Sequence, residues 1–211
     1  QRGHSDEPEK TLIDEGLEKL YTYVLDCLKK KLPPHLTYHH WEHTLHVIEM
    51  SEFIARQEGL SEEDIQLIKT AALFHDAGFI HLSKGHEEES IALASKKLPD
   101  FGYSKTEIDL IAGLIQATAI PQKPQTKLEC VLADADLEYL GTDQFEPIGH
   151  KLYEELKHYK PGLTWDEWND IQIDFLESHH YHTPYCIEHR TRQKEAHLQK
   201  LLEEKAQRKA H

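Results

Sequence analysis

The sequence predicts an all-α protein that folds as one helical bundle of about eight or nine helices. Apolar residues recur every three or four positions along nearly the whole chain, which is the spacing of amphipathic helices. Runs of β-branched residues in strict alternation, which would indicate strands, are absent. The connections are short, and neither an internal repeat nor a linker rich in glycine and serine interrupts the 211 residues. We therefore expect a single domain over residues 1–211.

The first three predicted helices have clear end signals. Pro33 and Pro34 stop the first helix, because proline cannot continue the backbone hydrogen bonds, and Gly59 ends the second. Ser61, followed three residues later by Asp64, is typical of a residue that caps a helix N-terminus. The expected helices span about residues 9–32, about residues 38–58, and the stretch from Ser61 to a stop at Gly78.

A loop and six further helices follow. Two of these helices open with a capping box, in which a serine or threonine precedes a glutamate by three positions. The pairs are Ser104 with Glu107 and Thr164 with Glu167. The loop is expected over residues 79–85, and the helices over about residues 86–98, 104–118, 126–140, 144–158, 164–179 and 186–208.

The composition disfavours several classes of function. Lys and Arg total 24 against 38 Asp and Glu, and the net charge of −14 lacks the basic surface that nucleic-acid binding needs. No apolar run approaches the roughly 18 residues of a membrane span, and the first ten residues contain no apolar core of a signal peptide. Cys27, Cys130 and Cys186 are widely spaced and odd in number. We expect a cytoplasmic protein that binds neither nucleic acid nor membrane.

Four side chains with metal-ligand chemistry lie on three predicted helices. His43 shares a helix face with apolar residues, His75 and Asp76 end an otherwise apolar helix, and Asp136 lies among leucines. A buried carboxylate is unfavourable unless it is paired or binds a metal. Taken alone, the adjacent pair has another explanation, namely a capping aspartate or a histidine bonded to a backbone carbonyl. The four together predict a metal centre.

The donor set indicates which ions would bind. Two imidazoles and two carboxylates suit Mn, Fe, Co, Ni or Zn, and tolerate Mg less well. Four protein ligands leave about two positions of a six-coordinate ion for water or substrate, as in catalytic rather than structural metal sites. We expect one tightly bound divalent ion. The second carboxylate oxygen of Asp76 could bridge to a second, weakly bound ion or hold a water molecule.

The order and flanks of these residues resemble the HD superfamily of metal-dependent phosphohydrolases, in particular its bacterial members. The stretch YHHWEHTLHV resembles the YHNxxH segment of that family, and DADLEYLG resembles its DAD(L/R)xxLG segment. The resemblance covers roughly residues 35–185 and implies a helical HD-domain core with a flanking helix at each end. It also implies the metal ligands His43, His75, Asp76 and Asp136.

Two neighbours of these ligands need separate assignment. Asp134 lies about 200° around the helix from Asp136, so one ion is not expected to bind both. The context Ala135-Asp136-Leu137 matches the family ligand, so Asp136 is the expected ligand. Asp134 is expected either to support the ligands from behind or to have a structural role. His39 matches the general acid of related phosphodiesterases, although it could also be an exposed histidine at a helix start.

Four further candidates lie near these ligands in the sequence. His40 stands where the family often has asparagine, and we assign it to substrate binding. His86 and Glu87 match a His-Glu pair of related bacterial sequences, in which the glutamate would orient the attacking water and the histidine would bind substrate or donate a proton. Lys84 is a candidate phosphate contact. The alternative for this stretch is a solvated acidic helix start, which the helix dipole favours.

The segment FLESHHYHTP resembles a FLxxxxxYhT stretch found in part of the family. Tyr181, His182 and Thr183 therefore either line the substrate pocket or cap and pack the last helices, and packing is the preferred interpretation. His182 is kept as a substrate-binding candidate. Arg190 and Arg192 lie on a highly charged helix, and we assign neither to phosphate binding.

The resemblance implies a metal-dependent phosphohydrolase that cleaves a nucleotide or another small phosphomonoester with metal-activated water. One alternative is an HD-fold hydrolase or oxygenase of a non-phosphate substrate, although the predicted helix 104–118 lacks the histidines that a di-iron site needs. The other is a regulatory HD domain that binds a nucleotide. The sequence leaves the oligomeric state open, with a homodimer as one option.

Overall fold

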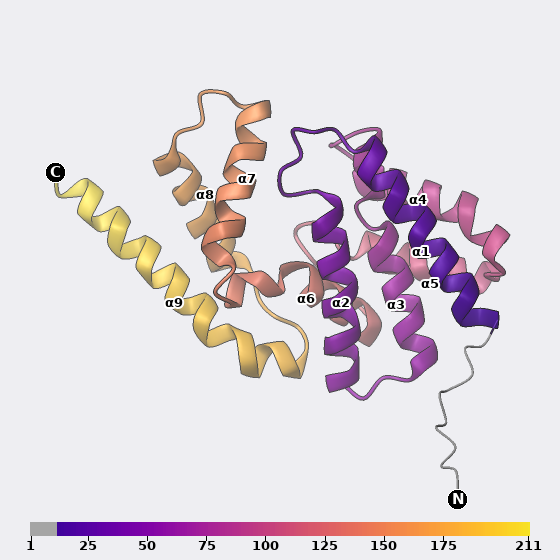
Figure 1. Ribbon diagram of the computed structural model, residues 1–211. Coiled ribbons are helices and arrows are strands. Elements are labelled where there is room, and N and C mark those ends of the chain that lie inside the picture. Colours follow the sequence, from indigo (N-terminus) through magenta and orange to yellow (C-terminus); the bar gives the residue numbers. More distant parts are fainter. Residues whose placement is uncertain (1–11) are drawn as a thin grey trace, which may run out of the picture.

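The computed structural model describes residues 12–211, which form nine α-helices and three short 3₁₀-helices and contain no β-strand (Figure 1). The all-α prediction is confirmed, and the first residues of the helix predicted from residue 9 lie outside the described range. None of the helices in this range is long and apolar enough to cross a membrane. The elements are α1 (Leu12–Lys31), α2 (Trp41–Gln57), α3 (Glu62–Phe74), η1 (Ala77–Ile80), α4 (His86–Lys97), η2 (Leu98–Phe101), α5 (Lys105–Gln116), α6 (Lys127–Leu137), η3 (Glu138–Gly141), α7 (Phe145–Tyr159), α8 (Trp165–Ser178) and α9 (Pro184–Lys209).

The predicted helix caps are present. The side chain of Ser61 accepts a hydrogen bond from the backbone amide of Asp64 at the start of α3. Complete capping boxes open α5, at Ser104, and α8, at Thr164. Each box satisfies backbone amides that would otherwise have no partner at the helix end, which is why these starts could be predicted from local sequence.

Several boundaries differ from the prediction, among them the end of α3, which lies at Phe74 and not at Gly78, and long-range contacts explain two of them. α2 begins at Trp41 rather than at Tyr38, because the amides of Tyr38 and His39 donate to Glu155 of α7. α6 ends at Leu137 and continues as η3, where the hydroxyl of Tyr181 donates to the carbonyls of residues 137 and 138. The predicted loop 79–85 begins inside the 3₁₀-helix η1.

The helices form two groups with separate hydrophobic clusters. α1 to α5 lie on one side and α7 to α9 on the other, and α6 lies between them (Figure 1). The larger cluster joins α1 to α6, with Ile54, Ile68 and Leu132 fully buried. The smaller cluster joins η3 and the last three helices, and it includes Leu140 and Leu176. The number of domains stays a prediction, and the two clusters meet at α6.

Two glycines allow close approach of helices near this junction. A Cβ atom on Gly78 would lie 2.0 Å from the backbone oxygen of His86, so α4 can pack on η1 only with glycine at this position. The amide of Gly78 donates to the hydroxyl of Ser90, which donates to the carbonyl of His75. A Cβ on Gly141 would lie 2.2 Å from the backbone oxygen of Arg190, where α9 packs on η3. The first of these contacts places the start of α4 beside the histidine and aspartate that follow α3.

Candidate metal centre

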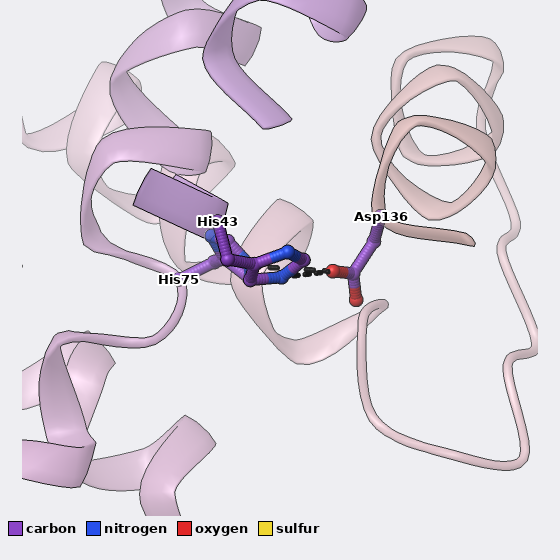
Figure 2. Close-up of side chains that lie close together, drawn as sticks. All are labelled: His43, His75 and Asp136. Atoms are coloured by element: carbon purple, nitrogen blue, oxygen red, sulfur yellow. Dashed lines mark hydrogen bonds and ion pairs between the residues drawn. The ribbon is translucent and has the colours of Figure 1, made fainter. Parts of the chain in front are cut away.

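Three of the predicted ligands meet where α2, α3 and α6 come together (Figure 2). His43 Nε2 lies 3.1 Å from Asp136 Oδ1, and His75 Nε2 lies 3.3 Å from the same oxygen. The donor atoms of the three residues all lie within 4.8 Å of one another. The two imidazole side chains are nearly buried, and Asp136 is 14% exposed.

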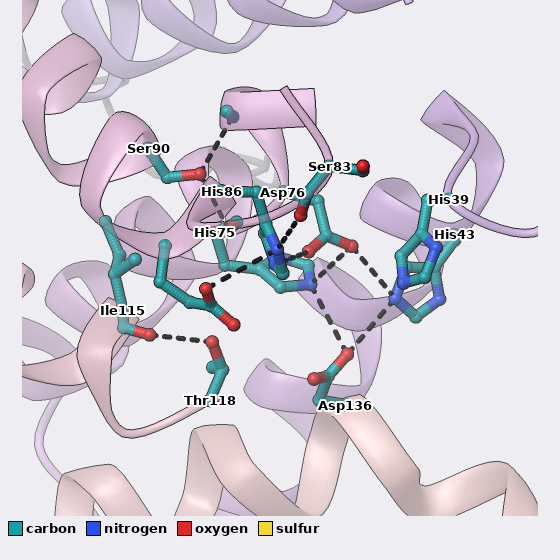
Figure 3. A network of polar contacts seen from close by, with 12 residues as sticks. His39, His43, His75, Asp76, Ser83, His86, Ser90, Ile115, Thr118 and Asp136 are labelled. Carbon is teal, nitrogen blue, oxygen red and sulfur yellow. Dashed lines mark hydrogen bonds and ion pairs between the residues drawn. The ribbon is translucent and has the colours of Figure 1, made fainter. Parts of the chain in front are cut away.

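Asp76 adds a second carboxylate to this cluster (Figure 3). Its Oδ2 atom lies 3.1 Å from His75 Nε2 and 3.4 Å from His43 Nε2. Neighbouring residues in a continuous helix point about 100° apart. Here α3 ends at Phe74, and the backbone at Asp76 (φ −109°, ψ 5°) has left the helix, so both side chains can reach the same point.

The polar atoms of this cluster fit a divalent cation. The Nδ1 atom of His75 lies 2.5 Å from the carbonyl oxygen of Ala72 and donates to it, so Nε2 of the neutral ring presents a lone pair. This Nε2 and Asp76 Oδ2 are both buried, and neither has a hydrogen-bond partner among the described residues. Buried acceptors without donors are unfavourable, and a cation that both atoms bind would satisfy both. The hydrogen bond to a backbone carbonyl that we considered as an alternative explanation for His75 is present, and it orients the ring toward the cluster.

Charge within the cluster shifts the pKa values of its members. Burial alone would raise the pKa of Asp76, but the neighbouring histidines His75, His86 and His39 hold it well below its usual value. Burial alone would lower the pKa of His75, but Asp76 and Asp136 raise it well above its usual value. A proton on His75 Nε2 thus occupies the place that a cation would take, and metal and proton compete there.

Glu155 fixes the backbone and the side chain of His39. Its Oε1 atom accepts hydrogen bonds from the amides of Tyr38 and His39, at 3.1 and 2.9 Å, and its Oε2 atom lies 2.5 Å from His39 Nδ1. Glu155 is 4% exposed, whereas the His39 side chain is 24% exposed. Burial alone would lower the pKa of His39, but the hydrogen bond to Glu155 and the surrounding carboxylates raise it above its usual value.

The sequence interpretation missed Glu155, although a signal for it exists. Leu152, Glu155 and Leu156 have the spacing of one helix face, so a carboxylate lies on an apolar stripe. The same argument identified Asp136. Glu155 and His39 are 116 residues apart, and nothing in the local sequence pairs them.

Phe79 packs between two candidate catalytic histidines. Its ring stacks on His39 at a centroid distance of 4.3 Å and on His86 at 4.0 Å. His86 Nε2 lies 3.4 Å from Asp76 Oδ1, the oxygen of that carboxylate other than the one nearest His75 (Figure 3). Because Phe79 belongs to a segment predicted as a loop, its role in placing both imidazoles was also missed.

The side chains of the other candidates make no described contact with those of the four clustered residues. Glu87 Oε2 is 3.5 Å from His86 Nδ1, so Glu87 lies behind that imidazole. Lys84 is exposed on the loop before α4. The described contact of the His40 ring is with Trp41, and His182 contributes its backbone amide to Asp134. The substrate-binding roles of Lys84, His40 and His182 stay predictions.

The contacts of Asp134 agree with the structural role, one of the two that we considered for it. Its carboxylate accepts hydrogen bonds from the amides of His182 and Thr183 and from the Thr183 hydroxyl, the last two at 2.7 Å. These bonds connect α6 to the start of α9, away from the metal cluster. Arg190 is not on a solvated face, because its Nε atom donates to the buried carboxylate of Glu138 at 2.8 Å.

Comparisons with known proteins agree with this geometry. Residues 40–138 match the family model of the HD domain, a range that includes all four clustered residues and excludes His39. None of the curated proteins is significantly similar to the chain. The crystal structure of Bacillus subtilis YpgQ in complex with ADP is similar, with a TM-score of 0.56 and 19% sequence identity over 92% of this chain and 97% of that chain. At this identity the similarity to YpgQ shows a common fold.

Proposed function

The chain belongs to the HD superfamily, and on this premise we propose that it is a metal-dependent phosphohydrolase of nucleotides or other small phosphomonoesters. The observation that supports this most is that two buried polar atoms, His75 Nε2 and Asp76 Oδ2, make no hydrogen bond and lie 3.1 Å apart beside His43 and Asp136. These four side chains would bind the ion. When bound, the ion supplies positive charge for a phosphate oxygen and lowers the pKa of a water molecule.

Asp76 has a second task in this proposal. Its Oδ2 atom faces the two imidazoles of the cluster, whereas Oδ1 lies 3.4 Å from His86 Nε2. Oδ1 therefore orients the attacking water and accepts one of its protons, and His86 restrains that oxygen. Glu87, behind His86, acts through this imidazole.

His39 is the proposed general acid. Glu155 accepts a hydrogen bond from Nδ1–H and fixes the ring plane. The other nitrogen, Nε2, can then deliver a proton to the leaving oxygen. The raised pKa of His39 keeps a larger fraction of the ring protonated near neutral pH. His86 is the second candidate for this role, and Glu155 makes His39 the preferred one.

The test is phosphate release from a panel of nucleotides and sugar phosphates after removal of bound metal and resupply of Mn, Co, Ni, Mg or Zn. Asp76→Ala is measured beside Asp109→Ala, a matched variant of an exposed aspartate on α5. We expect metal-dependent release that Asp76→Ala abolishes and Asp109→Ala preserves. Tightly bound metal without release from any substrate would contradict the proposal and favour a regulatory nucleotide-binding domain or a non-phosphate substrate.

A further inference from the structure

A cavity of about 240 Å³ lies directly beside the metal centre, between the two helix groups. Tyr38, His39 and Asp136 form its polar end, so the cavity continues from the place where the phosphate would be bound. The rest of the wall comes from η3, α7 and α8 and includes Leu152, Leu156 and Phe175, among other apolar residues. The volume equals that of about eight water molecules, which is room for roughly one aromatic ring or a short alkyl chain.

Apolar side chains also surround the mouth of this cavity. Ile120, after α5, is 61% exposed and Ile171, on α8, is 45% exposed, and both line the cavity. Large aliphatic side chains in contact with water at a concave site are typical of ligand-binding surfaces. Their position extends the apolar wall outward from the metal centre.

Away from its polar end, the wall has no Lys or Arg and few hydrogen-bond partners for a ligand. None of the lining residues is Lys or Arg, so a second phosphate inside the cavity would have no cation to neutralise it. Gln172 is one of the few polar lining residues, and its amide already donates to Asn169 at 2.9 Å. Trp168 Nε1, also in the wall, is a buried donor without a hydrogen-bond partner among the described residues, so it could serve one acceptor of a ligand. Most of the several polar edge atoms of a nucleobase would lose their hydrogen bonds to water without replacement.

We propose that this cavity binds the organic group of the substrate and that this group is an uncharged hydrocarbon, either an aryl ring or a short alkyl chain. The inference rests on the proposed function and narrows it from small phosphomonoesters in general to apolar ones. In the reaction, the water oxygen forms a bond to phosphorus and the ester P–O bond breaks. Asp76 accepts a proton from the water, and His39 gives a proton to the leaving oxygen. The products are inorganic phosphate and an alcohol or phenol.

Calorimetric binding of phosphonates to the metal-loaded protein tests this inference without turnover. The ligands are methylphosphonate, hexylphosphonate and phenylphosphonate, with adenosine monophosphate as the polar comparison. Each methylene that enters the cavity should strengthen binding by a factor of up to about four. We expect hexylphosphonate to bind at least about tenfold more tightly than methylphosphonate, and more tightly than adenosine monophosphate.

The variant Ile171→Gln tests whether the gain comes from this cavity. Ile187→Gln is the matched control, because Ile187 is 51% exposed on α9 and does not line the cavity. Both changes are at exposed helix positions, so folding should persist, and thermal unfolding checks this. Ile171→Gln should reduce the advantage of hexylphosphonate over methylphosphonate by at least about threefold, and Ile187→Gln should leave it unchanged.

The possible outcomes separate this inference from the proposed function. If methylphosphonate and hexylphosphonate bind equally, or if adenosine monophosphate binds best while esters are still hydrolysed, the inference is wrong and the proposed function stands. If Ile187→Gln and Ile171→Gln have the same effect, the cavity is not the binding site and the inference is also wrong. If no phosphonate binds and no phosphomonoester is cleaved, the proposed function fails and the inference fails with it.

Discussion

Glu155 and His39 illustrate how one buried residue determines the chemistry of another. Glu155 accepts two backbone amides through one oxygen and the imidazole through the other, so the residue fixes both the position and the protonation of His39. Glu155 is a positioning residue, since its described contacts are with His39 and Tyr38 and not with the ligand cluster. Its removal should therefore change how activity depends on pH, and not only how large the activity is.

Glu155→Gln should lower kcat by about ten- to a hundredfold with little change in KM, because a general acid contributes about 10²–10⁴ and would be only partly lost. Loss of the negative charge lowers the pKa of His39, so the proton donor is lost at a lower pH and the basic limb of the pH–rate profile moves toward acid. Glu154→Gln, at the exposed neighbouring position, is the control. An unchanged profile with reduced kcat would mean that Glu155 has only a structural role.

Competition between metal and proton at His75 gives a second prediction for a single residue. Because Asp76 and Asp136 raise the pKa of His75 well above its usual value, an ion must displace a proton near neutral pH. The apparent affinity for Mn or Zn should therefore increase about tenfold per pH unit between about pH 6 and about pH 7. Calorimetry in buffers of different ionisation enthalpy would count the protons released. Affinity that does not depend on pH, with no proton release, would contradict this account.

The contact of α4 with η1 shows how the arrangement of two elements determines the site. Gly78 lets the first turn of α4 approach closely enough for His86 to reach Asp76. The Ser90 hydroxyl accepts a hydrogen bond from the Gly78 amide and donates one to the His75 carbonyl. A larger residue at position 78 would clash with the backbone of α4 and not with a side chain that could change its conformation, so η1 and α4 would have to move apart. The packing of α4 and the contact between His86 and Asp76 should then be lost together.

Gly78→Ala should destabilise the fold by about 1–3 kcal/mol, because the new Cβ would lie 2.0 Å from the backbone oxygen of His86. Gly113→Ala is the control and should stabilise the fold by about 0.5–1 kcal/mol. No atom lies within 4 Å of a Cβ at this position, and alanine favours the helix more than glycine does. Chemical denaturation measures both. Equal stability of the two variants would show that α4 does not need this close approach.

The sequence predicted the helices and the four clustered residues better than the contacts between helix groups. Caps such as Ser104 depend on atoms three residues apart, and Asp136 stands out as a carboxylate on an apolar helix. In contrast, the start of α2 depends on Glu155, which is more than a hundred residues away. Phe79 was assigned to a loop because a 3₁₀ turn after a helix has no periodicity of its own.

Over the whole molecule, the candidate metal centre and the cavity lie at the junction of the two hydrophobic clusters. α6 contributes Leu132 to the larger cluster, Leu137 to the smaller one, and Asp136 to the centre between them. α9 joins the groups, since its start is bonded to Asp134 and its Lys194 donates to the backbone oxygen and the ring of His179, after α8. The net charge of −14 also means that an anionic substrate needs a local positive centre, which a bound ion would provide.

His179 should make the stability of the whole fold sensitive to acid. Burial and the adjacent Lys194 lower its pKa from 6.5 to about 3, so the unfolded chain binds a proton that the folded chain does not. The contribution of the neutral, buried His179 to the free energy of unfolding is therefore fully present above about pH 6.5 and decreases as pH falls toward about 3. Between about pH 6.5 and about pH 5, wild type should lose on the order of 1–2 kcal/mol more than His179→Gln. Denaturant unfolding at several pH values measures this difference, and His180→Gln, an exposed neighbour, should behave as wild type.

The most direct test of the central claim is a metal titration of the metal-free protein, with bound ion and phosphate release measured on the same samples. Activity should increase in proportion to occupancy and level off at about one tightly bound ion per chain, as expected for a single four-ligand centre. Alanine variants of His43, His75, Asp76 and Asp136 should each lose both the ion and the activity. Full activity without metal, or metal binding that survives loss of all four side chains, would contradict the account.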